Sequence, residues 1–541
     1  MDKRFDVVIE DGQVIDGTGR PAFAADVGIR HGKIDLIASR IDEAAARKVI
    51  HAHGLVVCPG FIDTHSHDDF YLLVHPKAPA KVRQGVTTTS IGHCGFSAAP
   101  WTQERLPLLQ DALRFMGAAQ LPSGQWGDGS FSGFLAHLNA LEPGINVVPL
   151  VGHNTLRMAA MGMAQRDPLP DELSVMKRLL AGALQEGAFG LSSGLVYPPG
   201  SCAKTAELIA LGQTAAAYGG IYLTHMRNES GRVMEALAEA IEIGREGRLP
   251  VVLSHHKTAG RSNWGRSVET LARIQKARAA GQTVALDVYP YTASSTYLAV
   301  IVPPDMTPLD HAHFKTLVGD PEFRDRLKRR IAAGGNGEDV LSEVGFEGIL
   351  VSASQRHPEF AGRSAAQLGE ALGRDPLDIL LDLLAEEGRA VQATFFWMAE
   401  EDVARILADP HSMVGSDGLP AFGPSHVHPR FFGTFPRVLS KYVRQDGVLT
   451  LEEAVRKMTS LPASIYGLQA KGRLKIGLDA DLVLFDPETI RDTATFIEPD
   501  QAPEGIPYVL VGGRLAVEEG RVTGTARGSV LRHPPAGRSN G

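Results

Sequence analysis

The chain has 541 residues, 44% of them hydrophobic and 21% charged, which is ordinary for globular proteins and enough for roughly three or four domains. Its net charge of −8 offers no basic surface to nucleic acid, and no apolar run is long enough for a signal peptide or a membrane span. The cysteines number only 3, which excludes a disulfide framework and favours the reducing cytoplasm.

The first 53 residues are predicted to form a small antiparallel sheet. Alternating runs such as FDVVIEDGQVID and ADVGIRHGKI are separated by glycine turns. The same pattern returns in residues 472–486 and 505–524. Because the termini of a domain often lie close together, these two ends are consistent with one discontinuous domain.

The middle of the chain alternates short apolar runs with helical segments. Helical spacing of apolar residues is seen, for example, in 170–187, 205–220 and 263–282. The runs lie at 55–62, 86–91, 147–151, 188–192, 221–225, 251–255, 284–288 and 412–416. Buried parallel strands alternating with helices predict an α/β fold, and eight such units favour a closed (β/α)8 barrel. An open doubly wound sheet is the alternative.

The interval between the seventh and eighth runs is much longer than an ordinary connection. It holds two further apolar runs, at 348–354 and 391–397, that lie outside the count of eight. We therefore expect an inserted, lid-like segment at the mouth of the barrel. The tail at 532–541 is expected to be frayed.

Potential metal ligands fall at the carboxyl ends of the predicted strands. His65 and His67, two residues apart in extended chain, point the same way and can reach one ion. Other His-x-His pairs occur, but this pair follows an apolar strand. Cys94, His225, His255 and Asp417 follow other strands. In a barrel these ends converge on one face, so the set predicts a site with sulfur, nitrogen and oxygen donors, which suit zinc.

Such a site predicts metal-assisted hydrolysis of an amide-like bond. The metal activates water and polarises a carbonyl, and a nearby carboxylate moves the proton to the leaving group. Asp417 is the best candidate for this carboxylate. A competing signal is GLSSG at 190–194, which matches a nucleophile elbow around Ser192. The prolines that follow, Pro198 and Pro199, argue against the helix that this motif requires.

With these residues in view, the sequence resembles the N-acyl-D-amino-acid deacylases (D-aminoacylases) of the amidohydrolase superfamily. The resemblance covers roughly residues 4–532. The matching stretches are PGFIDTHSHDD (59–69), GVTTTSIGHCGFSAAP (85–100), GAFGLSSGLVYPPG (187–200), THMRNES (224–230), LSHHKTAGRSNWGRS (253–267), LDVYPYTASST (286–296), GSDGLP (415–420) and HPRFFGTFPRVL (428–439).

The resemblance implies a (β/α)8 barrel with a small β-sandwich made from both termini. In this division the sandwich takes residues 1–56 and 466–541, and the barrel takes 57–465 with a lid-like insertion at about 297–350. The substrate would be a small N-acyl-D-amino acid, cleaved to a carboxylic acid and a free D-amino acid.

The resemblance also implies roles for individual residues. Cys94, His225 and His255 would hold a tightly bound zinc ion. His65 and His67, sharing Cys94, would form a second, weaker zinc site. Asp417 would be the general base and then the general acid. The substrate carboxylate would be held by Lys257, Tyr289 and Arg430.

Some positions leave alternatives open. His93 stands where the family more often has asparagine, and His153 is either a carbonyl-polarising group or a core residue.

The segment 288–305 has no lysine or arginine, so we expect a preference for neutral, apolar D-amino-acid side chains. The alternatives are an amidohydrolase acting on a dipeptide, a cyclic amide or a xenobiotic amide, and a non-catalytic metal-binding barrel.

Overall fold

The structure is a computed structural model that describes residues 4–121, 123–303, 306–307, 311–333, 340–420, 422 and 425–534. The cysteines Cys58, Cys94 and Cys202 are unpaired, as expected. None of the described helices has the length and apolar character needed to cross a membrane. Most of the tail that was expected to be frayed lies outside the described residues.

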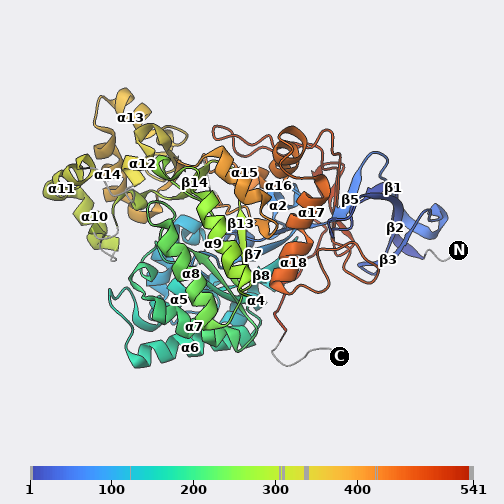
Figure 1. Ribbon diagram of the computed structural model, residues 1–541, viewed down its shortest axis with the longest axis horizontal. Helices are drawn as coiled ribbons and strands as arrows, with labels where there is room; N and C mark the ends of the chain where they lie inside the picture. The colour runs from blue at the N-terminus through green and yellow to red at the C-terminus, as the bar shows by residue number, and fades with distance from the viewer. Residues whose placement is uncertain are drawn as a thin grey trace.

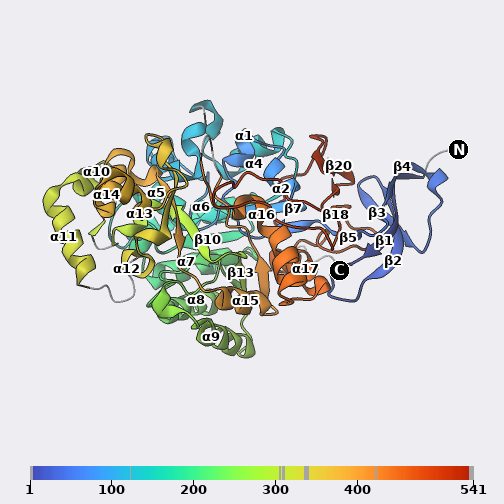
Figure 2. The same cartoon turned by 90° about the horizontal axis from the view of Figure 1, so that it is seen from above.

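Strands from both ends of the chain build one nine-stranded sheet. Its order is β21 (Arg521–Val522), β20 (Arg514–Glu518), β19 (Tyr508–Val511), β18 (Leu482–Phe485), β5 (Val56–Pro59), β1 (Phe5–Val14), β2 (Phe23–Arg30) and β3 (Lys33–Ala38), with β4 (Ala46–His51) also paired to β1. The joining pair is β18 with β5, which is antiparallel. The N-terminal strands β1 to β3 of this sheet lie at one end of the molecule, near the N-terminus (Figures 1 and 2).

The central part is an α/β fold with parallel strands. One sheet has the order β6 (Phe61–Asp63), β7 (Val86–Ile91) and β8 (Asn146–Pro149). The other has the order β17 (Ser412–Val414), β13 (Val284–Val288), β12 (Val251–Leu253), β11 (Ile221–His225), β10 (Gly190–Gly194) and β9 (Val151–Gly152). Every strand pair in both sheets is parallel.

Helices connect these strands at the predicted places. Those that follow them include α5 (His153–Met161), α6 (Pro170–Gln185), α7 (Thr205–Ala216), α8 (Val233–Gly247), α9 (Ser267–Ala279) and α15 (Glu400–Ala408). The chain then continues through α16 (Arg430–Arg437), α17 (Leu451–Met458) and α18 (Ser460–Tyr466). The helices earlier in the chain are α1 (Tyr71–Val74), α2 (Pro79–Val82), α3 (Leu106–Ala112) and α4 (Phe131–Ala140).

The first predicted strand, 55–62, is wrong as one element. The chain forms β5 and β6 there, on either side of Gly60, and the two strands belong to different sheets. A side chain at Gly60 would place its Cβ 2.2 Å from Thr87, so only glycine permits this close passage between the sheets. The run at 147–151 likewise divides into β8 and β9.

The long interval between β13 and β17 carries an antiparallel sheet of its own, in the order β14 (Ala293–Tyr297), β16 (Gln392–Phe396) and β15 (Ile349–Ala353). Its helices are α10 (His311–Gly319), α11 (Pro321–Ala332), α12 (Val340–Val344), α13 (Ala365–Leu372) and α14 (Pro376–Glu387). They gather at the end of the molecule opposite the N-terminal strands (Figures 1 and 2). The two apolar runs left outside the count of eight are β15 and β16.

Candidate metal centre

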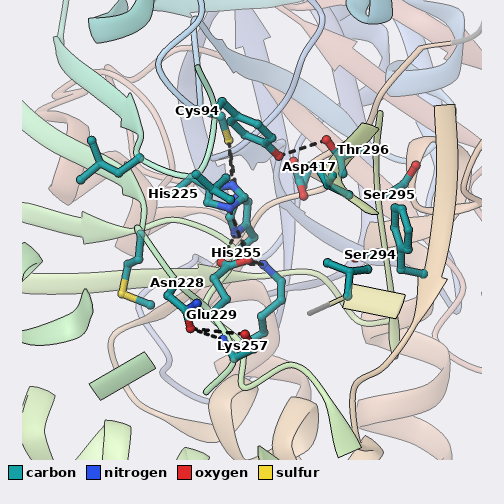
Figure 3. Close-up of a pocket in the computed structure, with 18 of the residues that line it drawn as sticks. Cys94, His225, Asn228, Glu229, His255, Lys257, Ser294, Ser295, Thr296 and Asp417 are labelled. Carbon is teal, nitrogen blue, oxygen red and sulfur yellow. Dashed lines mark hydrogen bonds and ion pairs between the residues drawn. The ribbon is translucent and has the colours of Figure 1, made fainter. Parts of the chain in front are cut away.

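The carboxyl ends of the parallel strands bring one thiol and three imidazoles together. Cys94 follows β7, and its Sγ lies 3.3 Å from Nε2 of His65, which follows β6. The same sulfur lies 3.4 Å from Nε2 of His255 and 3.8 Å from Nδ1 of His225. All four side chains are largely or wholly shielded from solvent. Figure 3 shows Cys94 beside His225, the last residue of β11, and His255, which follows β12.

Asp417, which follows β17, faces the same cluster. Its Oδ1 lies 3.2 Å from Nε2 of His67 and 3.5 Å from Nε2 of His65. One donor atom from each of His65, Cys94, His255 and Asp417 lies within 4.8 Å of the others. A second group with the same spacing joins His225 and His255 to Glu229.

The backbone at this site is held in a conformation that L-residues avoid. Cys94, His255 and Asp417 have φ angles of 51°, 37° and 47°, in the left-handed region. Each such residue costs on the order of 1–3 kcal/mol and persists only where its surroundings fix it. Strain of this kind at three converging residues is typical of a functional site.

Buried charges behind the cluster orient His65. Asp287 on β13 lies 3.4 Å from His65 Nδ1, and it accepts a hydrogen bond of 2.7 Å from the backbone N–H of His255. Asp63 on β6 accepts from the backbone N–H of His65 at 3.3 Å and from the ammonium of Lys81 at 2.8 Å. These contacts connect the strand ends to one another through fully buried side chains.

Burial and charge set the protonation of the cluster. Burial lowers the pKa of His225 and His255 well below the usual value, and it raises the pKa of the Cys94 thiol. Burial also opposes charge on His65, but the Asp287 carboxylate raises the pKa of that ring. Neutral imidazoles are the form that binds a metal, and one thiol with imidazoles and a carboxylate is a donor set that fits zinc.

The three residues expected to hold a substrate carboxylate lie together beside the cluster. The Lys257 ammonium is 5.6 Å and the Arg430 guanidinium 4.5 Å from the centre of the Tyr289 ring. Both cations already have an acidic partner. Lys257 Nζ lies 2.8 Å from Glu229, and Arg430 Nη1 lies 2.9 Å from Asp417.

A cavity of about 260 Å³ opens beside the cluster, and Arg430 is not among its lining residues. His67, Cys94, His225, His255, Lys257, Tyr289 and Asp417 line it. Much of the remaining wall is apolar, with Phe115, Leu195, Val300, Phe395, Trp397 and Leu419. Arg227 and Arg232 lie on the same wall.

Glu229 and Asp287 are the site residues that the sequence reasoning missed. Glu229 stands four residues after His225, inside a stretch already singled out, and Asp287 is the fourth residue of a predicted strand. A carboxylate close in sequence to a candidate ligand could have indicated both residues, because a histidine that binds a metal usually donates its second ring N–H to such a group.

Other histidines raised by the sequence take structural positions. His153 is fully buried at the start of α5, 2.7 Å from Glu207 Oε1, and is not among the cavity residues. His256, next to His255, points away from the cluster and contacts Thr270 at 2.9 Å. His93 stacks on His65 with ring centres 4.1 Å apart, so it supports a candidate ligand from behind.

Ser192 does not have the surroundings of a nucleophile. It donates a hydrogen bond of 2.5 Å to the carbonyl of Gly92, and it accepts one of 3.1 Å from the N–H of Gly95. The next α-helix, α7, begins only at Thr205. Ser192 therefore braces the turn that carries Cys94.

Comparison with known proteins gives consistent matches. The model of the Amidohydrolase family matches residues 48–318 and 354–517. The chain is 42% identical to an N-acyl-D-aspartate deacylase of Alcaligenes xylosoxydans xylosoxydans, over 97% of this chain and 95% of that protein. It is 39% identical to a D-aminoacylase of the same organism, over 98% of each.

Among solved structures, it is similar to the N-acyl-D-glutamate deacylase of Bordetella bronchiseptica. The identity is 38%, the TM-score is 0.83, and the match covers 98% of this chain and 100% of that one. That structure is complexed with zinc and with a phosphonate inhibitor that mimics the tetrahedral intermediate of the reaction.

Proposed function

Because the chain belongs to the amidohydrolase family, we propose that it is a zinc-dependent hydrolase that cleaves N-acyl-D-amino acids to a carboxylic acid and a free D-amino acid. The observation that carries this proposal is the group formed by His65, Cys94, His255 and Asp417, whose donor atoms lie within 4.8 Å of one another. A thiol, imidazoles and a carboxylate on one cavity supply both a metal site and a base.

Cys94, His225 and His255 would hold the tightly bound ion, and His65 and His67 would complete a second, weaker site around the shared thiol. When bound, zinc supplies Lewis-acid chemistry that activates water and polarises the amide carbonyl. The carboxylate of Asp417 takes the proton from the attacking water. It then delivers that proton to the amide nitrogen as the C–N bond breaks, which frees the amine of the D-amino acid.

Lys257, Tyr289 and Arg430 would orient the substrate through its α-carboxylate. The support for this assignment is that two cations flank one aromatic ring at the edge of the cluster. To bind the substrate carboxylate, the Lys257 ammonium would have to donate hydrogen bonds both to that carboxylate and to Glu229.

We also propose a preference for neutral, apolar side chains. Phe115, Phe395 and Trp397 provide apolar surface in the cavity, and Arg227 is already engaged by Glu239 at 2.9 Å. Arg232 lies on the same wall and is a cation that an acidic substrate side chain could contact. Substrates with acidic side chains are therefore the critical ones to compare with apolar substrates.

For the fold, we propose that the two parallel sheets close into a (β/α)8 barrel, in which β8 and β9 count as one interrupted strand. In support, the N–H of Thr64 lies 3.5 Å from the carbonyl of Val414, and the N–H of Phe189 donates to the carbonyl of Pro149 at 2.9 Å. A parallel bridge also joins Ser66 to Gly418. The proposed division remains a barrel over 57–465, a β-sandwich of 1–56 and 466–541, and a lid-like insertion at about 297–350.

The test is a chiral panel of N-acetyl amino acids, assayed with the zinc content measured. We expect turnover of the D-enantiomers, with N-acetyl-D-leucine and N-acetyl-D-phenylalanine preferred over N-acetyl-D-glutamate and N-acetyl-D-aspartate. A chelator should abolish the activity and zinc should restore it. Equal turnover of both enantiomers, or activity that a chelator leaves unchanged, would contradict the proposal.

A further inference from the structure

Glu229 contacts two histidines of the proposed tight site on the edges that face away from Cys94. His255 directs Nε2 to Cys94 Sγ at 3.4 Å and Nδ1 to Glu229 Oε1 at 2.9 Å. His225 is turned the other way, with Nδ1 3.8 Å from Sγ and Nε2 3.5 Å from Glu229 Oε2. Figure 3 shows the histidines between Cys94 on one side and Glu229 on the other.

We infer that Glu229 is a positioning residue that fixes the ring orientation and the protonated nitrogen of both His225 and His255. The inference rests on the proposed zinc site and gives a role to a carboxylate of the cavity wall that contacts the candidate ligands. An imidazole that binds a metal through one nitrogen carries its proton on the other, and that N–H requires an acceptor. Glu229 offers one carboxylate oxygen to each ring.

Lys257 holds this carboxylate in place. Its Nζ lies 2.8 Å from each oxygen of Glu229, whose side chain is only 9% exposed. A carboxylate this deeply buried needs a paired charge. Lys257 Nζ also lies 2.7 Å from His255 Nδ1. When His255 Nδ1 carries a proton, it cannot accept a hydrogen bond from Lys257. The ammonium then donates its hydrogen bonds to Glu229.

The same geometry argues against Glu229 as a direct ligand. Its carboxylate oxygens contact the ring nitrogens of His225 and His255 that face away from Cys94. An ion bound on that side would lose the thiolate. Thiolate is a preferred zinc ligand, so the ion belongs on the Cys94 side.

The experiment measures zinc affinity and metal environment in Glu229→Gln and Glu229→Asp. Metal-free protein is titrated with zinc against a chromogenic chelator, and with Co²⁺ to record the thiolate-to-cobalt absorption band. The matched control is Glu207→Gln, because Glu207 also contacts a buried histidine, His153, but lies outside the cavity. The wild-type protein is first assayed for zinc binding and for deacylation.

We expect zinc to bind Glu229→Gln about 10–100-fold more weakly than the wild type, the usual effect of losing such a carboxylate partner. Glu229→Asp should recover part of the affinity, Glu207→Gln should keep it, and the cobalt–thiolate band should survive in all three variants. Wild-type affinity in Glu229→Gln would overturn the inference, as would a cobalt spectrum showing that a direct ligand was lost. Failure of the wild type to bind zinc or to deacylate would instead overturn the proposed function and this role with it.

Discussion

The guanidinium of Arg430 lies 2.9 Å from the carboxylate of Asp417, and both side chains are buried at the mouth of the parallel strands. Burial alone would raise the pKa of Asp417, but Arg430 and the neighbouring histidines hold it well below its usual range. Asp417 is therefore an anion at neutral pH, which is the state that a general base must have.

Replacing Asp417 by asparagine removes this base while nearly keeping its shape. We expect Asp417→Asn to lose about 10²–10⁴-fold in kcat, the usual contribution of general acid–base catalysis. Zinc should remain bound, because Cys94, His225 and His255 are unchanged. Steady-state kinetics and metal analysis on the same preparation check both points. A kcat within tenfold of the wild type would reject Asp417 as the base.

The role of Lys257 in substrate binding can be tested by changing both the lysine and the substrate carboxylate that it would bind. Charged hydrogen bonds contribute about 1.5–3 kcal/mol, so replacing the substrate carboxylate by a carboxamide should lower kcat/KM about 10–100-fold in the wild type. In Lys257→Met the same change of substrate should cost much less, because the partner is already gone. Equal losses in the two proteins would show that Lys257 serves Glu229 and not the substrate.

Ser192 provides a test against serine chemistry. Its hydroxyl is occupied by Gly92 and Gly95, so Ser192→Ala removes two neutral hydrogen bonds, each worth about 0.5–1.5 kcal/mol of stability. Because neither bond involves the reacting atoms, kcat should stay within about tenfold of the wild type. Serine-directed phosphonylating reagents should not label the wild type. Complete loss of activity in a folded, zinc-loaded Ser192→Ala protein would instead support Ser192 as the nucleophile.

Much of this arrangement follows from sequence position alone. His225 ends a parallel strand, and Cys94 and Asp417 come three residues after two others. The chirality and pairing of such strands bring their carboxyl ends to one face. Glu229 could not be placed in this way, since it lies in the loop after β11 and its contacts depend on how that loop returns over His255.

The sequence patterns also could not predict which charged side chains are buried. Lys81 lies on the short helix α2, where a lysine is ordinarily exposed, yet it is fully buried between Asp63 and Asp68. Only the tertiary packing brings those carboxylates together. The same holds for Gly60, where an apparently continuous strand divides in two and where Thr87 leaves no room for a Cβ.

A second buried lysine gives a prediction about stability and pH. Lys457 on α17 is fully buried and donates hydrogen bonds to the carbonyls of Asp409 and of Ser412, the latter at 3.3 Å. Burial lowers its pKa to about 8, against an ordinary value of 10.5. Between these two values the unfolded chain binds more protons than the folded protein.

The free energy of unfolding should therefore rise with pH across that interval, by up to about 1.4 kcal/mol per pH unit from this group. Below pH 8 the contribution is constant, since the lysine is charged in both states. Lys457→Met should remove the rise, so the difference in unfolding free energy between wild type and variant should grow from pH 8 to pH 10. Lys441→Met is the matched control, because the pKa of that lysine is raised beside Asp446 and it stays charged throughout this interval. Denaturant unfolding at several pH values measures the effect, and parallel profiles for wild type and Lys457→Met would refute the assignment of a charge change to Lys457.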